Sequence, residues 1–80
     1  MKGITRAFQE TLRRRREAFG YSKRDLAAKV GIKASHVAYL ENGRRNPSLA
    51  LLIRLARVLR VRPAKLALQA IPQLAEFGVK

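Results

Sequence analysis

The chain has 80 residues, which leaves room for one small domain and for no second one. It contains no cysteine and a single histidine, so a disulfide, a thiolate metal site and a Cys/His catalytic pair are all excluded. Eighteen Lys and Arg residues against five Asp and Glu residues give a formal net charge of +13. Repulsion on this scale predicts a polyanionic partner, with nucleic acid as the first expectation and an anionic membrane surface as the second.

The remaining composition favours a small globular protein without catalytic chemistry. An apolar fraction of 48% is sufficient for a core, and because aromatic residues make up only 6%, that core is expected to be aliphatic. Charges interrupt every long apolar stretch, and the first residues lack the apolar segment of a signal peptide, so we expect no membrane span and a cytoplasmic location. No nucleophile–base pair, metal-ligand cluster or glycine-rich phosphate loop is present; we therefore expect no enzymatic activity, no cofactor and no metal ion.

Apolar positions recur with helical spacing, and no segment shows the alternation of a half-buried strand. A first helix is expected from roughly Thr5 to Phe19. Its buried face is marked by Phe8, Leu12 and Phe19, and Gly20 follows where a helix C-terminal glycine belongs.

A second helix is predicted at about residues 22–30, and a third follows closely at about residues 34–42. Ser22 and Asp25 form the capping-box pattern that opens the second helix, and Gly31 permits the positive φ of a tight turn. This spacing is typical of a helix-turn-helix whose third helix leaves its outer face free for a groove, with an ordinary helical hairpin as the alternative. The positions expected to face inward are Leu26, Ala27, Val30, Val37 and Leu40.

Two further helices complete the predicted fold. Ser48 is expected to cap the fourth helix, Pro63 to lie in the first turn of the fifth, and Pro72 to end or kink that helix. We find no internal repeat and no linker, which predicts a single all-α domain over residues 1–80 with a C-terminal tail at residues 72–80. The inward positions are expected to be Leu52, Ile53, Leu55, Ala56, Leu59 and Leu66.

A family resemblance extends over most of the chain, from Leu12 to Leu66. The matching residues are Leu12-Arg13 with Arg16, Gly20-Tyr21-Ser22, Leu26-Ala27, Val30-Gly31-Ile32, Val37, Leu40-Glu41-Asn42-Gly43, Asn46-Pro47-Ser48-Leu49, and Leu55-Ala56 with Leu59. Through them the sequence resembles the lambda-repressor-like helix-turn-helix family, or XRE type, of phage repressors and Cro proteins. The resemblance implies a compact all-α bundle of about five helices. It also implies binding of double-stranded DNA with the third helix in the major groove, usually as a homodimer on a two-fold symmetric site.

Arg16 and Glu41 are the two charged residues expected near the core. Arg16 lies four residues after Leu12, and Glu41 lies four residues after Val37, so both border buried helix faces. Opposite charges that point into one small core are best explained as a structural ion pair, and the family pattern contains such a pair. Two solvated charges are the alternative.

Lys23 and Lys33 lie where helices begin. A cation is unfavourable at a helix N-terminus, but a docked phosphate would reverse the sign of this effect. The family usually has uncharged polar residues at both places. We therefore expect these lysines to contact the DNA backbone or groove, with ordinary surface lysines as the alternative.

The resemblance assigns the exposed face of the third helix to base reading. Ala34 is suited to pack on a thymine methyl group, and Ser35 or Tyr39 to hydrogen-bond a base edge or a phosphate. His36 is either a base or phosphate contact or a solvated surface residue. Because no Gln, Asn or Arg occupies position 34 or 35, specificity is expected to depend on Lys33 or on DNA shape, or to be modest.

Arginines outside the third helix divide into two groups. Arg14 and Arg15 are expected to be solvated, because successive residues lie about 100° apart on a helix and cannot all face DNA. Arg60 replaces a glycine that the family often has after the fourth helix. It belongs with Arg54, Arg57 and Arg62 to a basic face expected to lie away from the groove. The backbone contacts that the resemblance implies are Arg13, Asn42, Arg44 and Arg45.

The most favoured function is sequence-specific DNA binding as a transcriptional regulator, as a rule a repressor, associated with the nucleoid. One alternative is an antitoxin-type module whose tail at residues 72–80 contacts a protein partner while the domain binds DNA. Another is a non-specific nucleic-acid or membrane binder. Apolar residues beyond the expected core either form a homodimer interface or cap the monomer's own core: Leu51, Leu68, Ile71, Leu74 and Phe77.

Overall fold

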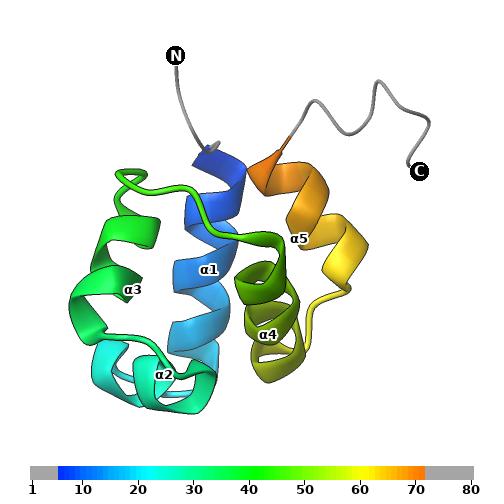
Figure 1. Cartoon of the computed structure of the whole chain (residues 1–80). Coiled ribbons are helices and arrows are strands. Elements are labelled where there is room, and N and C mark those ends of the chain that lie inside the picture. Colours follow the sequence, from blue (N-terminus) through cyan, green and yellow to red (C-terminus); the bar gives the residue numbers. More distant parts are fainter. Residues whose placement is uncertain (1–5, 72–80) are drawn as a thin grey trace.

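The structure is a computed structural model that describes residues 6–71, and over this range the chain folds into five α-helices without a strand. Figure 1 shows α3 at one end of the molecule and α5 at the other, with α1 and α4 between them. The all-α fold expected from the sequence is thereby confirmed. The helices are α1 (Arg6–Ala18), α2 (Lys23–Val30), α3 (Ala34–Glu41), α4 (Leu49–Leu59) and α5 (Pro63–Ala70).

The caps predicted for α2 and α4 are present in the structure. The Ser22 hydroxyl accepts a hydrogen bond from the backbone N–H of Asp25 at 3.0 Å, and the Asp25 carboxylate accepts one from the backbone N–H of Ser22 at 2.9 Å. Gly31 ends α2 in the left-handed conformation with φ of 78°, which a glycine adopts without steric cost. The Ser48 hydroxyl accepts from the N–H of Leu51 at 3.1 Å and caps α4. The expected positions of Thr5 and Pro72 lie outside the described residues.

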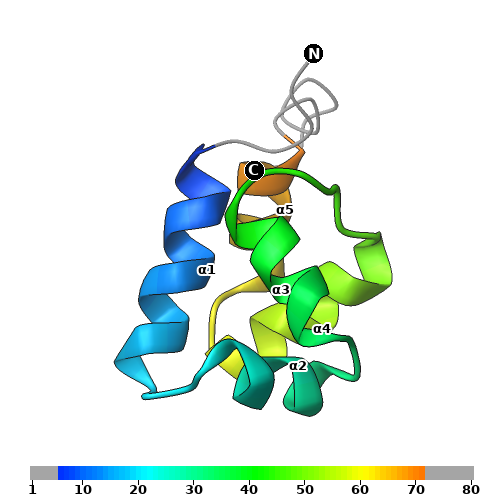
Figure 2. The same ribbon diagram turned by 90° about the vertical axis from the view of Figure 1, so that its left-hand side faces the viewer.

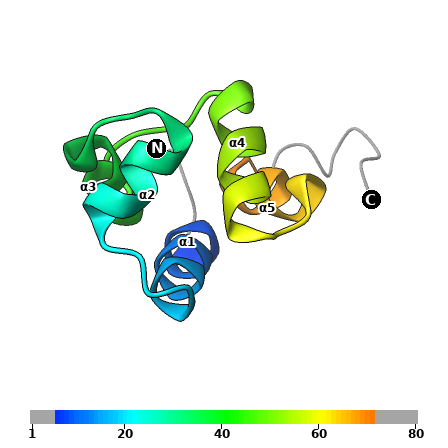
Figure 3. The same ribbon diagram turned by 90° about the horizontal axis from the view of Figure 1, so that it is seen from below.

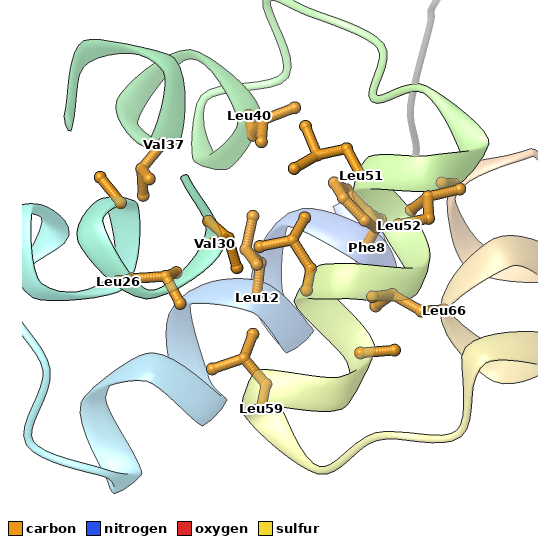
Figure 4. Close-up of a cluster of buried hydrophobic side chains, with 14 residues drawn as sticks. Phe8, Leu12, Leu26, Val30, Val37, Leu40, Leu51, Leu52, Leu59 and Leu66 are labelled. Carbon is orange, nitrogen blue, oxygen red and sulfur yellow. The ribbon is translucent and has the colours of Figure 1, made fainter. Parts of the chain in front are cut away.

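The core is aliphatic apart from one phenylalanine, as expected. Figure 4 shows side chains from all five helices converging between α1, α3 and α4, with Leu66 of α5 among them. The fully buried members come from every helix, so all five helices contribute to one core. The buried apolar residues are Phe8, Leu12, Leu26, Ala27, Val30, Val37, Leu40, Leu51, Leu52, Leu55, Ala56, Leu59, Leu66 and Ala70.

Two residues expected in the core are exposed instead. Phe19 is 40% exposed, because α1 ends at Ala18 and the chain turns away, so the helical spacing from Leu12 no longer applies. The Phe19 ring stacks on Tyr21 at 5.5 Å between ring centroids. Ile53 is 38% exposed, while Leu51 occupies the core instead. The first turns of α4 are apolar on nearly every side, so periodicity alone does not define the inward face.

The connection between α4 and α5 has two features that the sequence did not predict, one at Arg60 and one at Arg15 of α1. Arg60 adopts the left-handed conformation with φ of 58° in place of the usual glycine. Arg15, expected to be solvated, donates hydrogen bonds from Nε and Nη2 to the carbonyl of Leu59 at 3.0 and 2.9 Å, and from Nη2 to the carbonyl of Arg60 at 3.1 Å. A guanidinium at a helix C-terminus satisfies free carbonyls and opposes their negative charge.

We expect Arg60→Gly to raise the free energy of unfolding by about 1 kcal/mol, because it removes the steric cost of a left-handed side-chain-bearing residue. Urea denaturation measures the change. The matched control is Arg57→Gly in the interior of α4, which is expected to lower the same quantity by about 1 kcal/mol. Equal effects of the two substitutions would contradict the assignment of strain to Arg60.

The capping box makes stability depend on pH at the acidic end. Hydrogen bonds from Ser22 hold the pKa of Asp25 below its ordinary value of 3.8. Because the folded pKa is the lower one, the contribution of Asp25 is present above the unfolded pKa and is lost as pH falls through the folded pKa. We therefore expect the difference in urea midpoint between the unmodified protein and Asp25→Asn to be larger at pH 7 than at pH 2.5. A difference independent of pH would refute this.

Candidate nucleic-acid interface

An ion pair between α1 and the end of α3 fixes the pose of α3. Arg16 Nε lies 2.6 Å from Glu41 Oε2, and Arg16 Nη2 lies 3.1 Å from Glu41 Oε1, so the contact is bidentate. The two residues are only 8% and 4% exposed. Arg16 Nη1 also donates to the carbonyl of Tyr21 at 2.9 Å, which ties the turn before α2 to the same group. The hydrogen bond to Glu41 raises the pKa of Arg16 against the opposing effect of burial.

We expect Glu41→Ala to lower the free energy of unfolding by roughly 3–5 kcal/mol, because it leaves the Arg16 charge buried without its partner. Glu17→Ala is the matched control, since Glu17 is an exposed glutamate 4.0 Å from the same guanidinium. Urea unfolding of both variants gives the comparison. A loss below about 1 kcal/mol for Glu41→Ala would contradict a stabilising buried pair.

The turn between α2 and α3 is short and closed by backbone hydrogen bonds. The N–H groups of Gly31 and Ile32 both donate to the carbonyl of Ala27, at 2.8 and 3.0 Å. Ala27 is buried, and its small side chain allows α3 to approach α2 closely. Figure 2 shows α3 facing the viewer above α2, with α1 to one side. This pair of helices is the helix-turn-helix that the spacing predicts.

The outer side of α3 is hollowed and basic. A hollow of about 410 Å³ is lined by Lys33, Ser35, His36 and Tyr39 together with Ile32 and Arg45. An adjoining hollow of about 260 Å³ is lined by Tyr39, Arg44 and Arg45. We call the two hollows together the reading surface. The Arg45 guanidinium lies 5.8 Å from the centroid of the Tyr39 ring, a cation–π distance that joins the loop after α3 to the helix itself.

The reading surface brings together six of the ten predicted DNA-contacting residues, namely Lys33, Ser35, His36, Tyr39, Arg44 and Arg45. Ala34 is half-buried and packs against the core. Arg13 and Lys23 are exposed on α1 and α2, and Asn42 is exposed at the C-terminus of α3; none of these four lines the two hollows.

Two residues outside the predicted DNA-contacting set lie at this surface or against the loop beside it. Ile32 is half-buried and lines the larger hollow, so an apolar contact lies beside the polar groups. The side chain of Gln9 in α1 lies against the loop after α3: a Cβ added to Gly43, whose φ is 76°, would lie 2.5 Å from Gln9 Nε2. An Asn-Gly pair after a helix is a sequence signal for such a positive φ.

The N-terminus of α3 lacks a side-chain cap. Lys33 is the N-cap residue, and its side chain makes no capping hydrogen bond. Backbone N–H groups at an uncapped helix start are free to bind an anion such as a phosphate. Within residues 6–71, no group of His, Cys, Asp or Glu side chains is arranged to hold a metal ion. Over the same range, no helix combines the length and apolar character needed to cross a membrane.

The candidate interface residues for a second copy have different environments. Leu51 is buried in the monomer's own core, which was the alternative to a place in a homodimer interface. Leu68 and Ile71 are half-buried, and Ile71 packs against the core, whereas Leu74 and Phe77 lie outside the described residues. Another residue, Leu49 at the start of α4, is 61% exposed and precedes the exposed Ile53 by one helical turn.

The fold and the reading surface define a DNA-binding domain of the helix-turn-helix class. The helix-turn-helix family model HTH_3 matches residues 12–66, and the chain belongs to this family. It is 39% identical over 51 residues to an uncharacterized HTH-type transcriptional regulator of Archaeoglobus fulgidus, which covers 64% of this chain and 73% of the relative. A regulator of the same description from Sinorhizobium fredii is 38% identical over 55 residues, but the match spans only 28% of that relative's length. DNA-binding transcription regulation is accordingly the activity of the chain.

Solved structures show the same fold in different settings. The restriction-modification controller protein C.AhdI from Aeromonas hydrophila has a TM-score of 0.70 and 38% identity, over 76% of this chain and 92% of that one. The hydroxypropylphosphonic acid epoxidase of S. wedmorenis matches with a TM-score of 0.71 and 33% identity, but over only 35% of its own length. The DNA-binding domain of the P22 C2 repressor, at 23% identity and a TM-score of 0.70, shares the fold.

Proposed function

We propose that the protein represses transcription by binding a specific double-stranded DNA operator with α3 in the major groove. The observation that carries this proposal is the gathering of Lys33, Ser35 and His36 on the outer side of α3, beside the loop cations Arg44 and Arg45. The similarity to a restriction-modification controller protein over 92% of that chain supports a regulatory role.

The reading surface offers different side chains to the DNA backbone and to the base edges. Lys33 at the uncapped start of α3 and Arg44 after its end are suited to phosphates on either side of a groove. Ser35 and His36 present hydrogen-bonding groups from the first turn, where a recognition helix contacts base edges. The contact with the Tyr39 ring restricts the Arg45 side chain, so less conformational entropy is lost when its guanidinium binds DNA.

The proposal includes a homodimer. A reading helix of eight residues contacts few base pairs, so a specific site of useful affinity requires two copies on adjacent half-sites. Leu49 and Ile53 offer exposed apolar area for such a contact on α4, and Leu68 is half-buried on α5.

Selection from random duplex DNA at physiological salt tests the proposal directly. We expect enrichment of a two-fold symmetric motif with half-site centres about one helical turn, roughly 34–36 Å, apart. An unsymmetrical single half-site would retain the role of α3 but refute the homodimer. Salt-sensitive binding without any enriched sequence would refute operator recognition.

Lys33→Ala and Arg44→Ala are each expected to weaken duplex binding and to lower the slope of log K against log salt by about one unit, because each removes one phosphate contact. Arg54→Ala is the matched control: Arg54 is exposed on α4 and lines neither hollow of the reading surface. Fluorescence anisotropy at several salt concentrations measures all three. Unchanged slopes for Lys33→Ala and Arg44→Ala would remove these residues from the interface.

A further inference from the structure

A second basic concavity lies where α1 meets the connection between α4 and α5. It has a volume of about 250 Å³ and is lined by Thr11, Arg15, Arg60, Val61, Arg62 and Lys65. We call it the rear pocket. Four of its six lining residues are cations, and three of these are arginines, whose planar guanidinium groups match the geometry of phosphate oxygens.

The rear pocket lies apart from the reading surface. Figures 1 and 3 both show α3 and α5 at opposite ends of the molecule, with α1 and α4 between them. None of the residues that line the rear pocket also lines either hollow of the reading surface. DNA bound along α3 therefore leaves the cations of the rear pocket free for another anion.

The described carboxylates are all engaged elsewhere. Glu10 lies 3.9 Å from Arg14, Glu17 lies 4.0 Å from Arg16, Asp25 caps α2, and Glu41 is paired with Arg16. The fifth carboxylate of the sequence, Glu76, lies outside the described residues. No carboxylate is among the described residues that line the rear pocket; of its four cations, Arg15 has partial negative partners in the carbonyls of Leu59 and Arg60.

Hydrogen bonds fix one side chain of the pocket, and another lining residue has a strained backbone conformation. Arg15 is held by its three hydrogen bonds to the carbonyls of Leu59 and Arg60. Arg60 keeps a charged side chain at a left-handed position that glycine would occupy more easily, and strain of this kind clusters at functional sites. On the other side of the pocket, Arg62 begins α5 without a side-chain cap, so the helix dipole adds positive potential.

We propose that the rear pocket binds a backbone phosphate of a second nucleic-acid segment, so that one protomer contacts two duplexes through opposite faces. Nucleic acid fits because the pocket gathers cations from α1, from the connection between α4 and α5, and from α5, and a chain of regularly spaced phosphates meets such a spread of charge better than one small anion. This inference goes beyond operator recognition, since the rear pocket contains none of the reading-surface residues.

The test is a titration of the ¹⁵N-labelled full chain with a random-sequence 20-base-pair duplex, followed by amide chemical shifts. We expect the amide resonances of α3 to shift first. Those of Arg60, Arg62 and Lys65 are expected to shift only after the α3 site is saturated with duplex. Arg60→Gly combined with Lys65→Gln is expected to abolish the second phase and keep the first. Its fold is protected because the glycine relieves the left-handed strain. The matched control, Arg54→Gln with Arg57→Gln, removes two exposed cations of α4 that do not line the pocket and is expected to retain both phases.

Two parallel titrations decide what class of anion the rear pocket takes. Pyrophosphate and a polyglutamate peptide are titrated at matched charge concentration. Shifts at Arg60–Lys65 with either probe as strong as those with duplex would overturn nucleic acid as the ligand. An absent second phase with duplex would overturn the site altogether. Loss of the α3 phase would instead refute α3 as the DNA-contacting helix of the proposed function, so the two failures are distinguishable.

Discussion

The bidentate contact between Arg16 and Glu41 joins α1 to the C-terminal end of α3, and the position of the reading surface depends on it. Val37 and Leu40 attach α3 to the core along one side, but apolar contacts alone tolerate small rotations and shifts. Two parallel hydrogen bonds between planar groups do not, because both distances change when the helix turns. The third bond of Arg16, to the Tyr21 carbonyl, extends the same constraint to the turn that opens the helix-turn-helix.

Features of the fold that depend on local chemistry were predictable from the sequence. The capping residues Ser22 and Ser48 and the glycine at position 31 each satisfy a backbone requirement that few residue types meet. The ion pair was also predictable, since two opposite charges bordering buried faces of one small core have few other stable arrangements.

Features that depend on the path of the chain in space were not predictable. The predicted burial of Phe19 was wrong because α1 ends at Ala18, one residue before it. The predicted burial of Ile53 was wrong because the start of α4 is apolar on several sides, so its inward face is not defined by periodicity. The role of Arg15 needs knowledge of a carbonyl 44 residues away in sequence, which periodicity does not contain. The grouping of Arg45 with Tyr39 likewise follows from the course of a loop. The placement of the tail and its apolar residues lies outside the described part of the chain.

The two tyrosines are placed so that the protein carries its own optical reporters. The sequence has no tryptophan, so near-ultraviolet absorption and emission arise chiefly from Tyr21 and Tyr39. Tyr21 stacks on Phe19 beside the Arg16 contact, whereas Tyr39 lies on the reading surface under the Arg45 guanidinium. Spectral changes on unfolding therefore combine both environments, whereas changes on docking of a ligand at α3 are expected to come from Tyr39 alone. Tyr39 is therefore expected to respond to both binding and unfolding, and Tyr21 to unfolding only.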